Sequence, residues 1–153
     1  ETQWVLVASA KYFMLCENHE ALLQRVEFLR KNYRLSQMAE LFLSTLLVES
    51  AQKRQDFPTV EQEILNYITM REWLTSHPES VRGQSVLDLS SFYNVKTYCN
   101  LLHIGAQCAN LQRKYELANL YWKLFPWKEE GVDKTLYKED MEQTLQGLKR
   151  MVN

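Results

Sequence analysis

Two pairs of cysteine and histidine stand at spacings that could hold a metal ion. Cys16 and His19 would meet near a helix end, while Cys99 and His103 would meet on one helix face. Together these side chains could complete a tetrahedral zinc site. Zinc sites usually show clustered short-spaced pairs, however, and free cysteines are among the most buried residues. We therefore interpret Cys16, Cys99 and Cys108 as ordinary thiols and expect no metal and no cofactor.

The same residues give little support to catalysis. Cys99 and His103 could act as nucleophile and base, but a cysteine inside a helix lacks the helix N-terminus that commonly activates a thiol. The four glycines stand apart from one another, so no glycine-rich loop can hold a phosphate group. We expect that the chain is not an enzyme and assign no catalytic residue.

Basic residues cluster most densely at Arg25, Arg30, Lys31 and Arg34. On one helical edge they could contact nucleic-acid phosphates or an acidic partner, although clusters of this size are usually a solvated face. Lys and Arg (18) nearly balance Asp and Glu (19), so no overall positive field attracts nucleic acid or anionic lipid. Nucleic-acid binding through this edge is thus the alternative function, and a protein partner is favoured.

Large aromatic side chains are the stronger candidates for partner binding. Trp122 and Trp127 lie close together, and Trp127 follows a proline that ends a helix, where full burial is difficult. The alternative for Trp127 is packing against the following helix near Tyr137. Trp4 and Phe13 belong to a segment that is apolar almost all round, and such a helix is buried or covered by a partner. The candidate partner-binding residues are Trp4, Phe13, Trp122 and Trp127.

Apolar spacing of three and four residues predicts helices along most of the chain. Their expected ranges are 3–16, 19–33, 37–55, 60–76, 95–112, 114–125 and 134–152. The expected N-terminal caps are Asn18, Ser36, Thr59 in a capping box with Gln62, Asn94 and Asp133. On the last helix, an apolar stripe is expected at Tyr137, Met141, Leu145, Leu148 and Val152.

The residues between these helices set the expected organisation. Residues 77–84 form the longest loop and could be a hinge between two sub-bundles, and residues 85–93 fit a short helix better than an extended connector. The chain has the length of one ordinary domain. We expect a single all-α domain over 1–153, with about seven helices in antiparallel hairpins, as a helical bundle or a short α-solenoid.

A faint internal repeat relates two of the helices. Aligning Ala39 with Ala118, an offset of 79 residues, places Leu41 on Leu120 and Phe42 on Tyr121. A small residue flanked by large apolar ones lets a helix approach its neighbour closely.

The segment 95–127 resembles a tetratricopeptide-like repeat. Ala106 stands at the small position of the first helix, and Tyr115, Ala118 and Trp122 match three positions of the second. The segment departs from the family where Arg113 replaces the glycine of the turn, and its closing proline comes early. The resemblance implies a helical-hairpin scaffold that binds peptides or partner proteins.

From these observations we expect a protein-protein interaction module that accepts a helix or peptide of a partner through an apolar groove or end face.

Three cysteines are too few for a disulfide scaffold, and no apolar run is long enough to span a membrane. We therefore expect an intracellular location, cytoplasmic or nuclear, and no membrane partner. The chain begins without Met or a signal segment, so we expect a fragment of a larger protein that forms part of a complex. The oligomeric state stays open.

Overall fold

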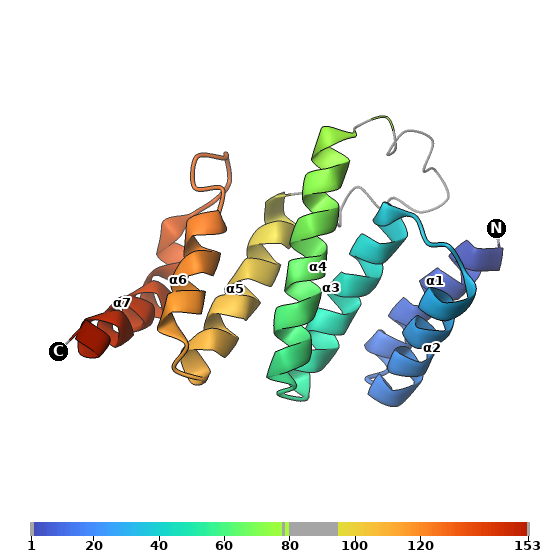
Figure 1. Ribbon diagram of the computed structural model, residues 1–153, viewed down its shortest axis with the longest axis horizontal. Coiled ribbons are helices and arrows are strands. Elements are labelled where there is room, and N and C mark those ends of the chain that lie inside the picture. Colours follow the sequence, from blue (N-terminus) through green and yellow to red (C-terminus); the bar gives the residue numbers. More distant parts are fainter. Residues whose placement is uncertain (1, 78, 80–94, 153) are drawn as a thin grey trace. The chain divides into compact units, whose positions relative to one another are not determined.

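A computed structural model of the chain describes residues 2–77, 79 and 95–152. These residues form seven α-helices, one short 3-10 helix and no strand, which confirms the all-α fold (Figure 1). The helices are α1 (Thr2–Leu15), α2 (His19–Asn32), α3 (Gln37–Lys53), α4 (Phe57–Ser76), α5 (Val95–Leu111), α6 (Tyr115–Leu124) and α7 (Lys138–Val152), with the 3-10 helix η3 at Lys134–Tyr137.

The helices pack as two compact units. Helices α1 to α4 belong to the first unit, residues 1–93, and helices α5 to α7 belong to the second, residues 94–153. The expected hinge at 77–84, except for His77 and Glu79, lies outside the described residues, as do the short helix expected at 85–93 and the cap expected at Asn94. None of the helices formed by the described residues combines the length and apolar character that a membrane span requires.

Helix α3 is the centre of the first unit. It packs against α1, α2 and α4, and every residue from Leu41 to Val48 is buried. The polar members of this run are satisfied: the Thr45 hydroxyl donates to the Phe42 carbonyl, and the Ser44 hydroxyl donates to Glu63. A helix surrounded by other helices needs apolar or small residues on all sides. The sequence predicted that the first helix is buried or covered by a partner, whereas the structure buries α3 on all sides and leaves part of α1 exposed.

The three antiparallel hairpins α1–α2, α3–α4 and α5–α6 share one backbone turn. Its central residue has a positive φ in each case, 55° at Glu17, 57° at Gln55 and 59° at Arg113. The N–H of the next residue donates to the carbonyl five residues earlier, at distances of 2.9, 2.8 and 2.8 Å. This is the Schellman arrangement, which usually places glycine at the left-handed position. Arg113 adopts that conformation at the place where tetratricopeptide-like repeats carry glycine.

Each turn is followed by a buried residue at the same spacing. Five residues after the positive-φ residue of the turn, the chain has Leu22, Val60 and Ala118, which are each fully buried. The repeat proposed from the sequence does not follow these hairpins. It aligns Ala39 with Ala118, but Ala39 belongs to the first helix of its hairpin and Ala118 to the second. The hairpin expected over residues 95–127 is present as α5 and α6.

Side-chain caps define several helix starts. Asn18 and Ser36 accept hydrogen bonds from Ala21 N–H and Ala39 N–H, both at 3.2 Å, as predicted. The capping box expected at Thr59 is wrong, because α4 begins at Phe57 and Asp56 is its cap. The Asp56 carboxylate accepts bonds from the Thr59 hydroxyl at 2.7 Å and the Thr59 N–H at 3.4 Å, which lower its pKa. Proline is favourable in the first turn of a helix, so Pro58 lies in the first turn of α4 instead of separating it from α3.

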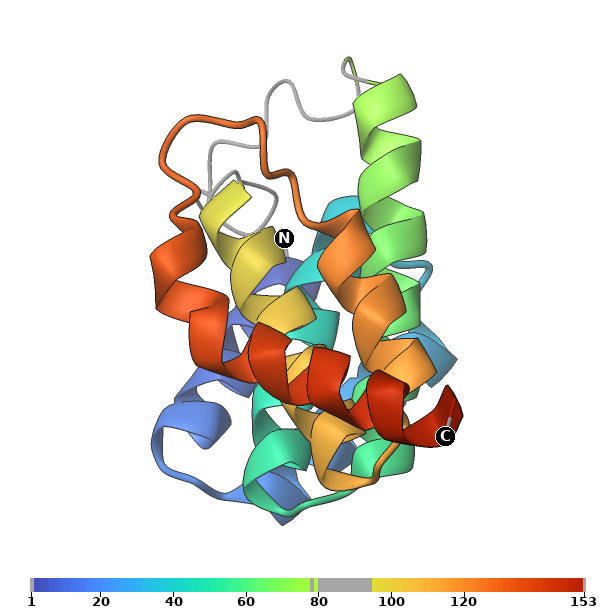
Figure 2. The same cartoon turned by 90° about the vertical axis from the view of Figure 1, so that its left-hand side faces the viewer.

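In the second unit, α7 lies across the α5–α6 hairpin (Figure 2). Asp133 caps η3, which leads directly into α7, so the cap was predicted correctly but the first turn is a 3-10 turn. The buried face of α7 is centred on Thr144 and Gly147. The predicted apolar stripe is wrong in part, since Leu145 and Val152 are exposed.

Candidate partner-binding groove

An open groove of about 480 Å³ runs between α1 and α2 in the first unit. We call it the α1–α2 groove. Its lining residues are Leu6, Phe13, Ala21, Gln24, Arg25 and Phe28. Four of the six are apolar, and Phe28 is 47% exposed. Because exposed aromatic side chains grouped in a hollow are typical of binding sites, this groove is the best candidate for contact with a partner.

Helix α1 explains why the groove is open. Its inner side, with Val7, Ala10 and Met14, is buried. The remaining sides are also apolar, and Val5, Tyr12 and Leu15 are 69%, 63% and 71% exposed. A helix that is apolar all round is stable when it is covered on all sides. Among the described residues of the first unit, α1 is covered on one side, so its outer residues are available to another molecule.

Arg25 is the charged residue of the α1–α2 groove. Its guanidinium lies over the Phe13 ring, 5.4 Å from the ring centroid, and donates a hydrogen bond to the Ser9 hydroxyl. The Ser9 hydroxyl in turn donates to the Leu6 carbonyl at 2.6 Å. These contacts hold the cation above an aromatic floor, where cation–π attraction is favourable.

A second groove, of about 560 Å³, lies on the other side of α2. It is lined by Leu23, Val26, Glu27, Arg30, Lys31, Leu47, Thr59 and Glu63, and we call it the α2–α4 groove. Charges of both signs line it, and one of the cations is already paired. This groove therefore has neither the aromatic lining of the α1–α2 groove nor the single sign of charge that nucleic acid requires.

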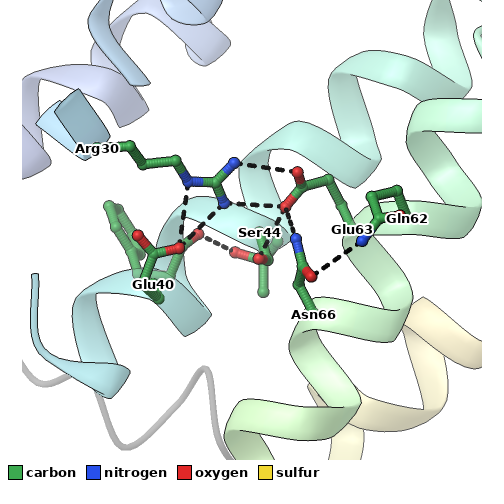
Figure 3. A network of polar contacts seen from close by, with 8 residues as sticks. Arg30, Glu40, Ser44, Gln62, Glu63 and Asn66 are labelled. Carbon is green, nitrogen blue, oxygen red and sulfur yellow. Dashed lines mark hydrogen bonds and ion pairs between the residues drawn. The ribbon is translucent and has the colours of Figure 1, made fainter. Parts of the chain in front are cut away.

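The paired cation is Arg30, which joins α2 to α3 and α4 (Figure 3). Its guanidinium donates to both oxygens of Glu63, at 3.0 and 3.1 Å, and to Glu40 at 3.2 Å. Ser44 and Asn66 also donate to Glu63, at 3.0 and 3.3 Å. Burial opposes ionisation of Glu63, but these bonds and the charge of Arg30 outweigh it and hold the pKa below its usual value. The pair is a structural clamp between helices.

The predicted basic edge is therefore divided. Arg25 lines the α1–α2 groove, Arg30 is held by two carboxylates, and Lys31 lines the α2–α4 groove. Arg34 is exposed beyond the end of α2. Arg25 therefore lies on a different side of α2 from Arg30 and Lys31, because a helix turns its successive residues to different sides.

Of the predicted aromatic anchors, Phe13 lines the α1–α2 groove. Trp4 is half-buried on α1 and does not line it. Trp122 is buried at 4% exposure, and its indole N–H donates to the Thr144 hydroxyl at 3.0 Å. That hydroxyl donates in turn to Asn110 at 2.8 Å, so Trp122 is part of a buried network joining α5, α6 and α7.

Trp127 is packed into the second unit. Its ring stacks on Phe125 with centroids 4.7 Å apart, and its indole N–H donates to the Trp122 carbonyl at 3.0 Å. The centroid of Tyr137 is 6.1 Å away, and the Lys134 ammonium lies over the Trp127 ring at 5.2 Å. These contacts match the alternative interpretation, in which Trp127 packs near Tyr137.

The cysteine and histidine residues occupy separate environments. Cys16 is exposed, whereas Cys99 and Cys108 are buried. A ring nitrogen of His19 is 2.7 Å from the Ser50 hydroxyl, and one of His103 is 2.5 Å from Asp140. Among the residues that the structure describes, no group of three or more His, Cys, Asp or Glu side chains is arranged to hold a metal ion.

Comparisons of the chain with known protein families, curated proteins and solved structures found no match. The assignment of the candidate site therefore rests on the geometry of the groove. Sequence reasoning found Phe13 but missed Phe28 and Gln24, because both lie off the apolar stripe of α2. A phenylalanine on the polar side of an amphipathic helix was the signal that could have located the groove.

Proposed function

We propose that the chain is a protein-protein interaction module whose α1–α2 groove binds a helix or peptide of a partner protein through apolar contacts. The observation that carries the proposal is the combination of an open, largely apolar groove with a helix, α1, whose outer residues are uncovered. Helix-in-groove recognition uses apolar side chains of an incoming helix at about one- and two-turn spacing. The chain would act as a helical scaffold within a larger assembly.

The lining supports a protein partner over nucleic acid. A nucleic acid is held by several cations along its phosphates, and binding weakens steeply as salt is added. The α1–α2 groove has one cation among its six lining residues. Apolar contact with a protein, by contrast, is maintained at high salt.

The test is affinity capture from nuclease-treated cell lysate, washed at low and high salt, with three forms of the immobilised chain. Phe28→Ser removes an exposed ring from the α1–α2 groove. Leu23→Ser is the matched control, because Leu23 is an exposed apolar residue of the same helix that lines the α2–α4 groove.

We expect the wild type and Leu23→Ser to retain the same proteins through high salt, and Phe28→Ser to lose them. Capture that is identical for all three forms would reject the α1–α2 groove as the binding site. Capture that is lost with nuclease or high salt would instead support the basic residues and a nucleic acid.

A further inference from the structure

Arg25 lies near the middle of the α1–α2 groove. Helices α1 and α2 are antiparallel, and the contacts of Arg25 with Ser9 and Phe13 place it opposite the central turns of α1. Leu6 and Phe28 consequently lie toward one end of the groove, and Phe13 and Ala21 toward the other. The groove thus has apolar residues at both ends and a cation between them.

This cation has unused binding capacity. A guanidinium carries five N–H donors in a planar fork that matches a carboxylate. Among the residues that the structure describes, Arg25 donates one hydrogen bond, to Ser9, and lies over the Phe13 ring, and no carboxylate lies within ion-pair distance of it. Arg30, five residues further along α2, shows the contrast, since two carboxylates occupy its fork.

The length of the groove matches two turns of a helix. Leu6 and Phe13 are seven residues apart on α1, and Ala21 and Phe28 are seven apart on α2, which corresponds to about 10 Å of helix. An incoming helix spans this distance between its positions i and i+7, and positions i+3 and i+4 then lie over the centre. A residue there would reach Arg25.

We propose that the α1–α2 groove selects an acidic amphipathic helix, with large apolar residues at positions i and i+7 and an Asp or Glu at i+3 or i+4 that pairs with Arg25. This inference rests on the proposed function and adds the chemistry of the partner. A bound helix would cover the pair together with the apolar lining and so exclude water, which strengthens the attraction between guanidinium and carboxylate. A long-chain fatty acid also combines a carboxylate with an apolar chain, and the test includes it.

The test selects helical peptides of about four turns from a displayed random library on the immobilised full chain. Selection is repeated on Arg25→Glu, on Arg25→Gln, which removes the charge but keeps a hydrogen-bonding group for Ser9, and on Phe28→Ser. Lys31→Glu is the matched control, because it makes the same change of charge on the other side of α2. Circular dichroism checks that each variant is folded.

We expect the wild type and Lys31→Glu to enrich peptides with the acidic residue between two apolar anchors. The affinity of such a peptide should fall at least about tenfold on Arg25→Glu, which should enrich Lys or Arg at the same position, and less on Arg25→Gln. Replacing the acidic residue of the peptide by Gln should weaken its binding to the wild type by a similar factor.

The other outcomes distinguish a failure of this inference from a failure of the proposed function. Peptides that require Phe28 but show no acidic preference and bind Arg25→Glu equally well would overturn this inference and leave the proposed function in place. If no selected peptide requires Phe28, both are overturned. Oleate is titrated onto the same variants, and its binding at the α1–α2 groove without any selected peptide would assign the groove to a lipid and overturn both as well.

Discussion

At the scale of single residues, Glu63 stabilises the first unit through its charge. Because its pKa is held below the usual value by Arg30, it contributes stability above the unfolded pKa, which is about 4.3. That contribution is lost as the pH falls through the lower, folded-state pKa. Removing one partner of a buried ion pair also leaves the other with an incomplete set of bonds.

We therefore predict that Glu63→Gln lowers the free energy of unfolding at pH 7 by about 1–3 kcal/mol. It should also flatten the loss of stability below about pH 5. Chemical denaturation at several pH values measures both effects. Glu72→Gln, at an exposed position of the same helix, is the control and should change neither. A variant as stable as the wild type at pH 7 would show that Arg30 is satisfied by Glu40 alone.

Gly147 allows α7 to approach α6 closely. A Cβ atom at this position would lie 2.4 Å from the ring of Tyr115, a distance that carbon atoms cannot maintain. Alanine is favoured over glycine in a helix by about 1 kcal/mol, but overpacking a rigid contact costs more, about 1–3 kcal/mol.

Gly147→Ala should consequently destabilise the second unit, and Tyr115→Ala should make the same change tolerable. Thermal unfolding of the two single variants and the double variant gives the coupling between the sites. Purely additive effects would mean that Tyr115 moves aside without cost and that the close approach is not needed.

At the scale of elements, the α5–α6 turn uses a residue that is not suited to it. Arg113 has a φ of 59°, and this left-handed conformation costs a residue with a Cβ about 1 kcal/mol relative to glycine. The turn is nevertheless formed, because its hydrogen bonds and the burial of Ala118 five residues later stabilise it.

Arg113→Gly is expected to stabilise the second unit by about 0.5–1 kcal/mol, whereas Arg113→Val should destabilise it, since β-branched residues rarely adopt positive φ. Denaturant unfolding compares the two variants with the wild type. If both variants were equally destabilised, the Arg113 side chain would have a role of its own, and the backbone argument would fail.

At the scale of the whole molecule, each unit has its own buried residues and its own polar network. The first unit contains the Arg30–Glu63 clamp, and the second contains the Trp122–Thr144–Asn110 network together with a cluster of aromatic rings. A unit needs a hydrophobic core of its own to fold without the rest of the chain, and each of the two units has one.

We predict that residues 94–153, expressed alone, form a helical unit that unfolds cooperatively. Circular dichroism during thermal unfolding tests this expectation. Thr144→Val provides the internal check, since it leaves the Trp122 N–H and the Asn110 carbonyl without their partner and should lower the midpoint. A helical signal that declines gradually, without a transition, would contradict an independent core.

The sequence by itself determined the helices. Apolar spacing and caps located α1 to α3, α5 and α6 to within a few residues, because helix formation and its termination depend on side chains close together in the chain. The start of α4 was missed since an Asp-Phe-Pro run can either separate helices or begin one. The run begins α4 because the hairpin turn is already complete at Gln55, whose positive φ is not predicted by the neighbouring residues.

The tertiary structure decided which apolar faces were covered. The sequence shows that both α1 and α3 are strongly apolar, but only packing places α3 among its neighbours and leaves the outer side of α1 exposed. For the same reason Arg25 and Arg30, similar in sequence, have different surroundings, one over an aromatic ring and the other between two carboxylates. Burial and pairing depend on residues far apart in the chain, and the fold is what brings those residues together.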